Sequence, residues 1–244
     1  RLLRPRRQTN MNESAVWPGD LSDLIYFRRK GVNTDNPHAV TEIFETHVAR
    51  YVGAPYCAMT NSCTAAIKLA IAWHLKEWWS DWRTQTYERR VPLSIPRPGY
   101  ISVPQAIIHA GGRPVFRDED WRGSYQIEPL PVWDSARKFT SGMYRAGQFQ
   151  CVSFHASKIL GLEQGGAILH DDPAADKWFR RARFDGRTPG VHPKDEAFEF
   201  LGWHEYANPS TAAQGILRLY SLPRHNEPLE NSDYPSLDTL PIFQ

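Results

Sequence analysis

One lysine in the stretch SFHASKILGLEQGGAIL, residues 153–169, is placed where it could carry out covalent chemistry. Lys158 lies five residues after a serine and seven before a Gly-Gly pair, among small and apolar side chains. A semi-buried lysine amine is easier to deprotonate than a solvated one, and the neutral amine attacks carbonyl carbons. The alternative is a solvated lysine beside a turn, which is the usual state of this side chain. The spacing alone leaves both interpretations open.

Two other passages place polar groups where strands are expected to end. The turn NSCT, residues 61–64, separates the apolar stretch YCAMT from a helical pattern, and free amides at a helix N-terminus bind anions, although most such turns bind nothing. Asp134 ends the apolar stretch LPVWD, either as a ligand-binding carboxylate or as the cap of a helix. Ligands of α/β sheets bind beyond the carboxyl ends of strands, so these groups and Lys158 could share one site.

The elements that would position these groups alternate along the chain. Residues 40–52 have helical periodicity, and Gly53 is a plausible stop. Short helices are also expected in ISVPQAIIH and GILRLY, and PLSIPRPGY is expected to be an extended loop. The expected strands are YCAMT, PVFRD, LPVWD, CVSFH and GGAILHD. This alternation predicts an α/β domain with a mainly parallel sheet.

A tryptophan-rich passage follows the NSCT turn. The helix that begins there is expected to continue through the tryptophans, which either pack against the domain body or form an aromatic binding surface. Packing is the favoured interpretation, and the purpose of the extension is left open. The residues concerned are Trp73, Trp78, Trp79 and Trp82.

Composition narrows the class of protein. With 244 residues, of which 41% are hydrophobic, the chain can bury a sizeable core. The formal net charge of +2 gives no indication of nucleic-acid binding, and no apolar run approaches the roughly 20 residues of a membrane span. The nine histidines show no metal-binding spacing, so no metal site is expected. Three cysteines without a CxxC motif favour a reducing, cytoplasmic setting.

A series of passages occurs in the order found in one protein family. The chain resembles the DegT/DnrJ/EryC1/StrS family of nucleotide-sugar aminotransferases, which use pyridoxal 5′-phosphate (PLP), over about residues 38–219. The passages are IFETHVARYVG, NSCTAAI, GYISVPQAIIHAGGRPVFRD, DSAR, SFHASKILGLEQGGA and LGWHEYANPSTAAQG.

The resemblance implies a fold and a domain organisation. It implies the α/β large domain of a type I PLP-dependent transferase, with a mainly parallel seven-stranded sheet flanked by helices. Residues 20–220 would form this PLP-binding domain, and residues 221–244 would be a tail in place of the family's small C-terminal domain. Residues 1–19 are expected to be a disordered basic arm, with contact to an acidic partner as the alternative.

The resemblance also implies a reaction and roles for two residues. The enzyme would transfer an amino group from an amino-acid donor, expected to be glutamate, to a keto sugar linked to a nucleotide, as a homodimer with shared active sites. Lys158 would hold the cofactor as a Schiff base and then carry a proton. Asp134 would keep the pyridine nitrogen protonated.

The remaining roles implied by the resemblance concern the cofactor's phosphate and ring. Cys63, Thr64 and Ser153 would hold the phosphate, with cysteine replacing the usual glycine. Tyr100 would stack on the ring, with loop-to-core packing as the alternative. The final position, His204, matches an asparagine that reaches the phosphate from the neighbouring subunit.

Two further departures leave other functions open. Arg137 stands where the family has the His or Gln that reaches the phenolic oxygen, and Gln164 stands where it has a glutamate. Arg137, His204 and the short C-terminus suggest a binding or assembly protein with little catalysis as one alternative, which the retained Lys158 and Asp134 disfavour. A PLP-dependent sugar dehydratase or epimerase is another, although the dehydratase branch typically replaces the lysine with histidine.

Overall fold

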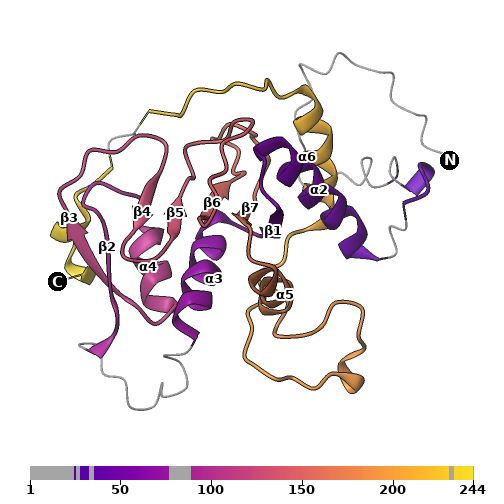
Figure 1. Cartoon of the computed structure of the whole chain (residues 1–244), viewed down its shortest axis with the longest axis horizontal. Helices are drawn as coiled ribbons and strands as arrows, with labels where there is room; N and C mark the ends of the chain where they lie inside the picture. The colour runs from indigo at the N-terminus through magenta and orange to yellow at the C-terminus, as the bar shows by residue number, and fades with distance from the viewer. Residues whose placement is uncertain (1–24, 26–27, 33–35, 77–88, 231–233, 244) are drawn as a thin grey trace.

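Seven strands in the described part of the chain form the layer on which the helices pack (Figure 1). The computed structural model describes residues 25, 28–32, 36–76, 89–230 and 234–243. The strands are β1 (Tyr56–Thr60), β2 (Pro92–Pro96), β3 (Arg113–Arg117), β4 (Tyr125–Ile127), β5 (Val132–Asp134), β6 (Phe149–Ser153) and β7 (Gly166–His170). The helices are α2 (Pro37–Val52), α3 (Cys63–Leu75), α4 (Ser102–His109), α5 (Pro173–Ala182) and α6 (Pro209–Ser221), with 3₁₀ turns η3 (Pro193–Asp195), η4 (Leu237–Thr239) and η5 (Pro241–Phe243).

The α/β class and its helices agree with the sequence-based expectation, but the sheet is not mainly parallel. Five strands pair in the order β1-β7-β6-β5-β4, and β2 and β3 form a separate pair. The pairings β2–β3 and β5–β6 are parallel, whereas β1–β7, β6–β7 and β4–β5 are antiparallel. A short turn, residues 128–131, joins β4 to β5, and a connection of that length only permits an antiparallel pair.

The passage PLSIP is a strand, β2, and the expectation of a loop there was wrong. Alternate residues of a strand point their N–H groups to opposite neighbours. Residues 91 and 97, which flank β2, bond to Arg113 and Arg117 of β3, so the backbone groups of residues 92, 94 and 96 face β4. The prolines have no N–H to donate, and a single bridge between Ser94 and Glu128, with N–O distances of 2.8 and 3.0 Å, joins the two sheets. The prolines therefore explain why seven strands divide into five and two.

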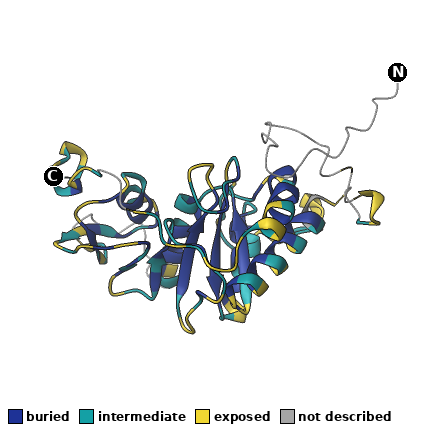
Figure 2. Cartoon of the chain, turned by 90° about the horizontal axis from the view of Figure 1, so that it is seen from above, coloured by how far each residue is buried: buried dark blue, intermediate teal, exposed yellow. Residues whose placement is uncertain are grey.

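The main sheet separates two hydrophobic clusters. Side chains alternate across β1, where Ala58 packs with α3 and α4 while Cys57 and Met59 pack with α2 and α6. The sheet and the inward helix faces are buried, and exposed residues lie on the outer faces and loops (Figure 2). The α2–α6 pair is close because Gly215 leaves space for the ring of Phe44.

The segment after α6 packs on the same domain. Leu237 is only 1% exposed and lies in the cluster of α3 and α4, while the ring of Phe243 lies 5.8 Å from that of Phe116. Trp73 lies in α3 and packs 5.7 Å from Trp178, as the packing interpretation predicted. None of the described helices has the length and apolar character of a membrane span. The expected arm, residues 1–19, and the tryptophans at 78, 79 and 82 lie outside the described residues.

Candidate active site

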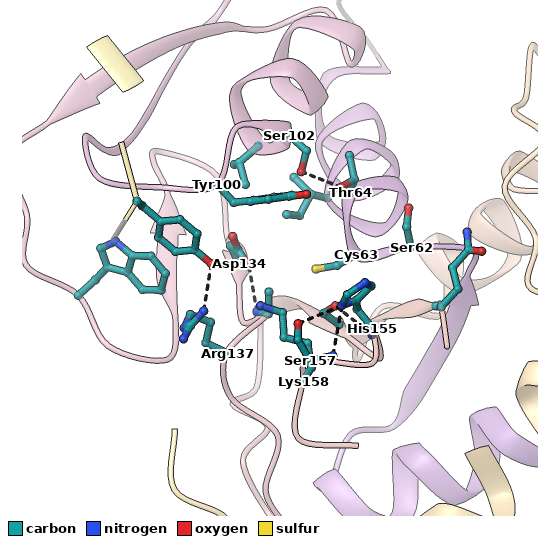
Figure 3. Close-up of a pocket in the computed structure, with 18 residues that line it drawn as sticks. Ser62, Cys63, Thr64, Tyr100, Ser102, Asp134, Arg137, His155, Ser157 and Lys158 are labelled. Atoms are coloured by element: carbon teal, nitrogen blue, oxygen red, sulfur yellow. Dashed lines mark hydrogen bonds between the residues drawn. The ribbon is translucent and has the colours of Figure 1, made fainter. Parts of the chain in front are cut away.

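A pocket of about 590 Å³ opens beside the carboxyl ends of β5 and β6. Its labelled residues come from the start of α3, the region before and at the start of α4, the end of β5 and the β6–β7 loop (Figure 3). Such a volume lies within the range of small-molecule sites. Seven of the eight residues expected to form the site line it: Cys63, Thr64, Tyr100, Asp134, Arg137, Ser153 and Lys158.

Lys158 lies in the loop between β6 and β7, and this loop is fixed at both ends. The amide of Phe154 donates to Gly165 O (2.9 Å), and the amide of Leu162 donates to Phe154 O (2.8 Å). Phe154 and Leu162 are fully buried in the cluster below the sheet, so the loop between them has a defined course. Lys158 itself is half-buried and lines the pocket. The structure therefore favours the pocket lysine over the solvated one.

The Gly-Gly pair after the lysine has a steric role. Gly165 has a φ of +127°, a conformation that favours glycine. A side chain at Gly166 would clash with the backbone nitrogen of Cys63. The pair therefore lets β7 approach the start of α3, which brings the lysine loop and the helix N-terminus to one pocket.

Asp134 is the buried carboxylate of the pocket, with 6% of its surface exposed. Its Oδ2 accepts a hydrogen bond from the Tyr125 hydroxyl (2.9 Å), and its Oδ1 accepts from the Ala136 amide (2.9 Å). Burial raises the pKa of Asp134 above its ordinary value, although these donors and the charges of Lys158 and Arg137 oppose the rise. A cationic ring nitrogen at this carboxylate would offset the cost of burying its charge.

The start of α3 is suited to an anion. The hydroxyl of Ser62 caps the helix by accepting from the Ala65 amide (3.1 Å), whereas no described residue accepts a hydrogen bond from the amides of Cys63 and Thr64. The Thr64 hydroxyl lies 2.8 Å from that of Ser102. Amides and hydroxyls gathered at a helix N-terminus bind phosphate groups.

The cysteine that replaces the usual glycine is compatible with this turn. Cys63 is the first residue of α3, where helical dihedrals accept a side chain. Burial raises the pKa of the Cys63 thiol well above its ordinary value, so the group stays neutral and is a poor nucleophile. Ser153, at the end of β6, pairs with Gly166 and so lies near this turn.

The aromatic side of the pocket is formed by Tyr100 and by residues that the sequence did not indicate. Tyr100 is 57% exposed, so it is not simply packed into the core. Its ring lies 6.3 Å from that of Tyr234, which comes from the C-terminal segment and also lines the pocket. Arg137 donates through Nη1 to the Tyr234 hydroxyl at 3.1 Å (Figure 3). The guanidinium is therefore engaged by the C-terminal segment at the pocket wall.

His204 does not line this pocket. Its Nδ1 lies 2.9 Å from Asp185 Oδ2, its ring packs 4.7 Å from Tyr206, and its side chain is 70% exposed. The expected role of His204 is in the pocket of a neighbouring subunit, and a single chain does not test it.

The sequence analysis did not identify the pocket residues Ser102 and Tyr234, nor Tyr125, which does not line the pocket but donates a hydrogen bond to Asp134. Ser102 had a usable signal, because it opens an expected helix two residues after Tyr100. Tyr125 lies on β4, which was not expected, and nothing in the local sequence links Tyr234 to the site. These two tyrosines reach the site only through long-range packing.

The residues present fit PLP. Such a cofactor needs an amine, a carboxylate for its ring nitrogen, a phosphate cradle and an aromatic face, and the pocket contains one of each. Asp134 and the unpaired amides at the start of α3 are groups that this ligand would satisfy. Among the described residues, no group of His, Cys, Asp and Glu side chains is placed to hold a metal ion.

Solved structures share this fold at low sequence identity. AtS13 from Actinomadura melliaura superposes with a TM-score of 0.65 and 17% identity over 90% of this chain and 69% of its own. Helicobacter pylori PseC, an aminotransferase involved in the biosynthesis of pseudoaminic acid, superposes with a TM-score of 0.59 and 15% identity. The match covers 75% of this chain and 58% of PseC. The dehydratase ColD, bound to GDP-perosamine, superposes with a TM-score of 0.59 and 18% identity. The match covers 76% of this chain and 61% of ColD. The chain thus spans about three fifths to two thirds of the length of these structures.

The sequence itself identifies the family. No curated protein matches the chain. The model of the DegT/DnrJ/EryC1/StrS aminotransferase family matches residues 30–146 and 140–228, which is most of the sequence. The protein therefore has the type I fold of PLP-dependent aminotransferases, and it belongs to the DegT/DnrJ/EryC1/StrS aminotransferase family.

Proposed function

We propose that this protein is a PLP-dependent aminotransferase that moves an amino group from glutamate to a keto group on a nucleotide-linked sugar. The observation that carries the proposal is the convergence of Lys158, Asp134 and the start of α3 in one pocket. The sugar substrate is supported by relatives such as PseC and ColD, whose names refer to sugar chemistry. The retained Lys158 favours amino transfer over dehydration.

Each residue would have a defined task. PLP, when bound, supplies an aldehyde that condenses with amines and a ring that takes up electrons. The Lys158 amine holds the cofactor, and once released it moves a proton to and from the substrate carbon. Asp134 holds a proton on the ring nitrogen. The amides of Cys63 and Thr64, with nearby hydroxyls of Thr64 and Ser153, bind the phosphate.

The remaining tasks concern the ring and the second subunit. Tyr100 covers the ring and limits access of water, and Arg137 provides a positive charge at the pocket wall. A homodimer is proposed in which His204 reaches the phosphate of the other subunit. Its exposed side chain is consistent with such a contact. The free thiols Cys57, Cys63 and Cys151 support a cytoplasmic location.

The test is the absorption spectrum of the protein after addition of PLP, followed by borohydride reduction and peptide mass mapping. The parent chain should show a visible band, and reduction should attach the cofactor to the Lys158 peptide. Lys158→Ala should lose the attachment. Lys177→Ala, at an exposed position on α5, is the matched control and should retain it.

Glutamate should bleach the band if the protein transfers amino groups. A band that persists with every amino acid would instead favour a PLP protein of another activity. No band and no attachment in the folded parent chain would contradict the proposal and favour a binding protein.

A further inference from the structure

The C-terminal segment, residues 234–243, is built into the domain. Leu237 is 1% exposed, and its amide donates to Arg97 O (2.9 Å). Ser236 forms a bridge with Pro98, and Asp238 pairs with Arg97 at 3.4 Å. Arg97 and Pro98 directly follow β2 and precede Tyr100, so the segment is fixed beside the pocket.

This attachment brings Tyr234 to the pocket in a defined orientation. Its ring stacks on Trp121, with centroids 6.3 Å apart and planes within 11°. Trp121 is itself 8% exposed, and its indole N–H donates to Pro98 O (2.9 Å). Tyr234 therefore rests on a rigid surface, with its hydroxyl directed to Arg137.

Arg137 is held by Tyr234 and by the chain that precedes the C-terminal segment. Its Nη1 donates to the Tyr234 hydroxyl (3.1 Å), and its guanidinium lies 5.7 Å from the centre of that ring. Its carbonyl accepts from the Leu229 amide (2.9 Å), just before the segment. Burial raises the pKa of Asp134, and the positive charge of Arg137 opposes that rise.

We propose that Tyr234 is a positioning residue of the active site, which holds the Arg137 guanidinium at the pocket wall beside Asp134. The C-terminal segment is then a structural part of the binding site. The proposal rests on the proposed PLP site, because Arg137 acts on the carboxylate that would meet the cofactor ring. Tyr234 acts through Arg137 and through the wall that it forms with Trp121.

The first experiment measures the contact without any cofactor. Tyr234→Phe removes the hydroxyl and keeps the ring stacked on Trp121, and Arg137→Met removes the guanidinium. We expect Tyr234→Phe to lower the Tm by about 2–4 °C in the parent background and to have no effect in the Arg137→Met background. Tyr220→Phe, at a 72% exposed position on α6, is the matched control and should leave the Tm unchanged. Additive losses in the double variant would overturn the proposal.

The second experiment measures PLP affinity by absorption titration of the same variants. Loss of one hydrogen bond should raise the Kd of Tyr234→Phe about 3- to 10-fold, and again only where Arg137 is present. An unchanged Kd, with a lowered Tm, would assign Tyr234 a purely structural role and overturn the proposal while PLP binding stands. A parent chain that binds no PLP would overturn both proposals, and the missing band in the parent itself identifies that case.

Discussion

Asp134 illustrates how single residues in this pocket depend on their surroundings. Its carboxylate is buried at the end of β5 and accepts from a tyrosine hydroxyl and a backbone amide. Burial alone would favour the protonated acid, whereas the nearby cations Lys158 and Arg137 favour the carboxylate. A cationic ligand beside this carboxylate would oppose the effect of burial and favour the charged form.

A half-buried histidine, His74, predicts sensitivity to acid. Its Nε2 has no hydrogen-bond partner among the described residues, its ring packs 4.6 Å from Phe149, and burial lowers its pKa to about 4. Between pH 6.5 and about 4 the unfolded chain binds a proton that the folded chain does not. Stability should therefore fall as the pH falls through this window.

The measurement is urea unfolding of the parent and His74→Leu between pH 7 and pH 4. Over this range the free energy of unfolding should fall by about 1 kcal/mol less in the leucine variant than in the parent. The difference is modest because His74 keeps some solvent contact. His109→Leu, at an exposed position at the end of α4, is the control and should behave as the parent does. Equal losses in His74→Leu and the parent would show that His74 does not contribute.

At the scale of elements, family motifs far apart in sequence meet at single contacts. Two adjacent residues of α2, Phe44 and Glu45, contact segments that are distant in the sequence. Glu45 accepts from the Met59 amide (2.7 Å) and pairs with Arg183, both buried. Phe44 faces Gly215 of α6. These contacts fix α2 against β1 and α6, on the opposite side of the sheet from α3.

The contact between α2 and α6 can be tested with a pair of substitutions. A Cβ added at Gly215 would lie 2.5 Å from the Phe44 ring, so Gly215→Ala should lower the free energy of unfolding by about 1–3 kcal/mol. Phe44→Leu makes room for that methyl group but removes buried surface. The double variant, measured by urea denaturation, should therefore be less destabilised than the sum of the single variants. Strict additivity would show that the two helices adjust without mutual contact.

At the scale of the whole molecule, the proposed shared site predicts complementation between subunits. Lys158→Ala removes the amine of one pocket, while His204→Ala removes the group expected to reach across. In a mixed dimer, one of the two pockets has both residues intact. Each variant alone should have low activity. Mixing the two, with unfolding and refolding to exchange subunits, should raise the activity to about a quarter of that of the parent.

Gel filtration with light scattering should first establish that a dimer forms. No recovery from the mixture, with subunit exchange demonstrated, would place each active site within one chain. It would also leave His204 as a surface residue paired with Asp185.

The sequence by itself determined the parts of this protein that depend on near neighbours. The periodicity of residues 40–52, the turn that leads into α3 and the strands on either side of the Lys158 loop are local patterns, and the structure contains all of them. The order of the motifs was enough to identify the family, whose model matches most of the chain.

Only the tertiary structure decided the remaining features. Proline is rare inside strands, so β2 could be recognised only from its partner β3 and from the single bridge at Ser94. The three-residue strand β4 exists because it pairs with β5, which brings Tyr125 to Asp134. Tyr234 reaches Arg137 across 97 residues of chain because Leu237 is buried beside β2. Pairing and burial between distant segments leave no pattern within a local window of sequence, and for that reason Tyr125 and Tyr234 could not be identified from it.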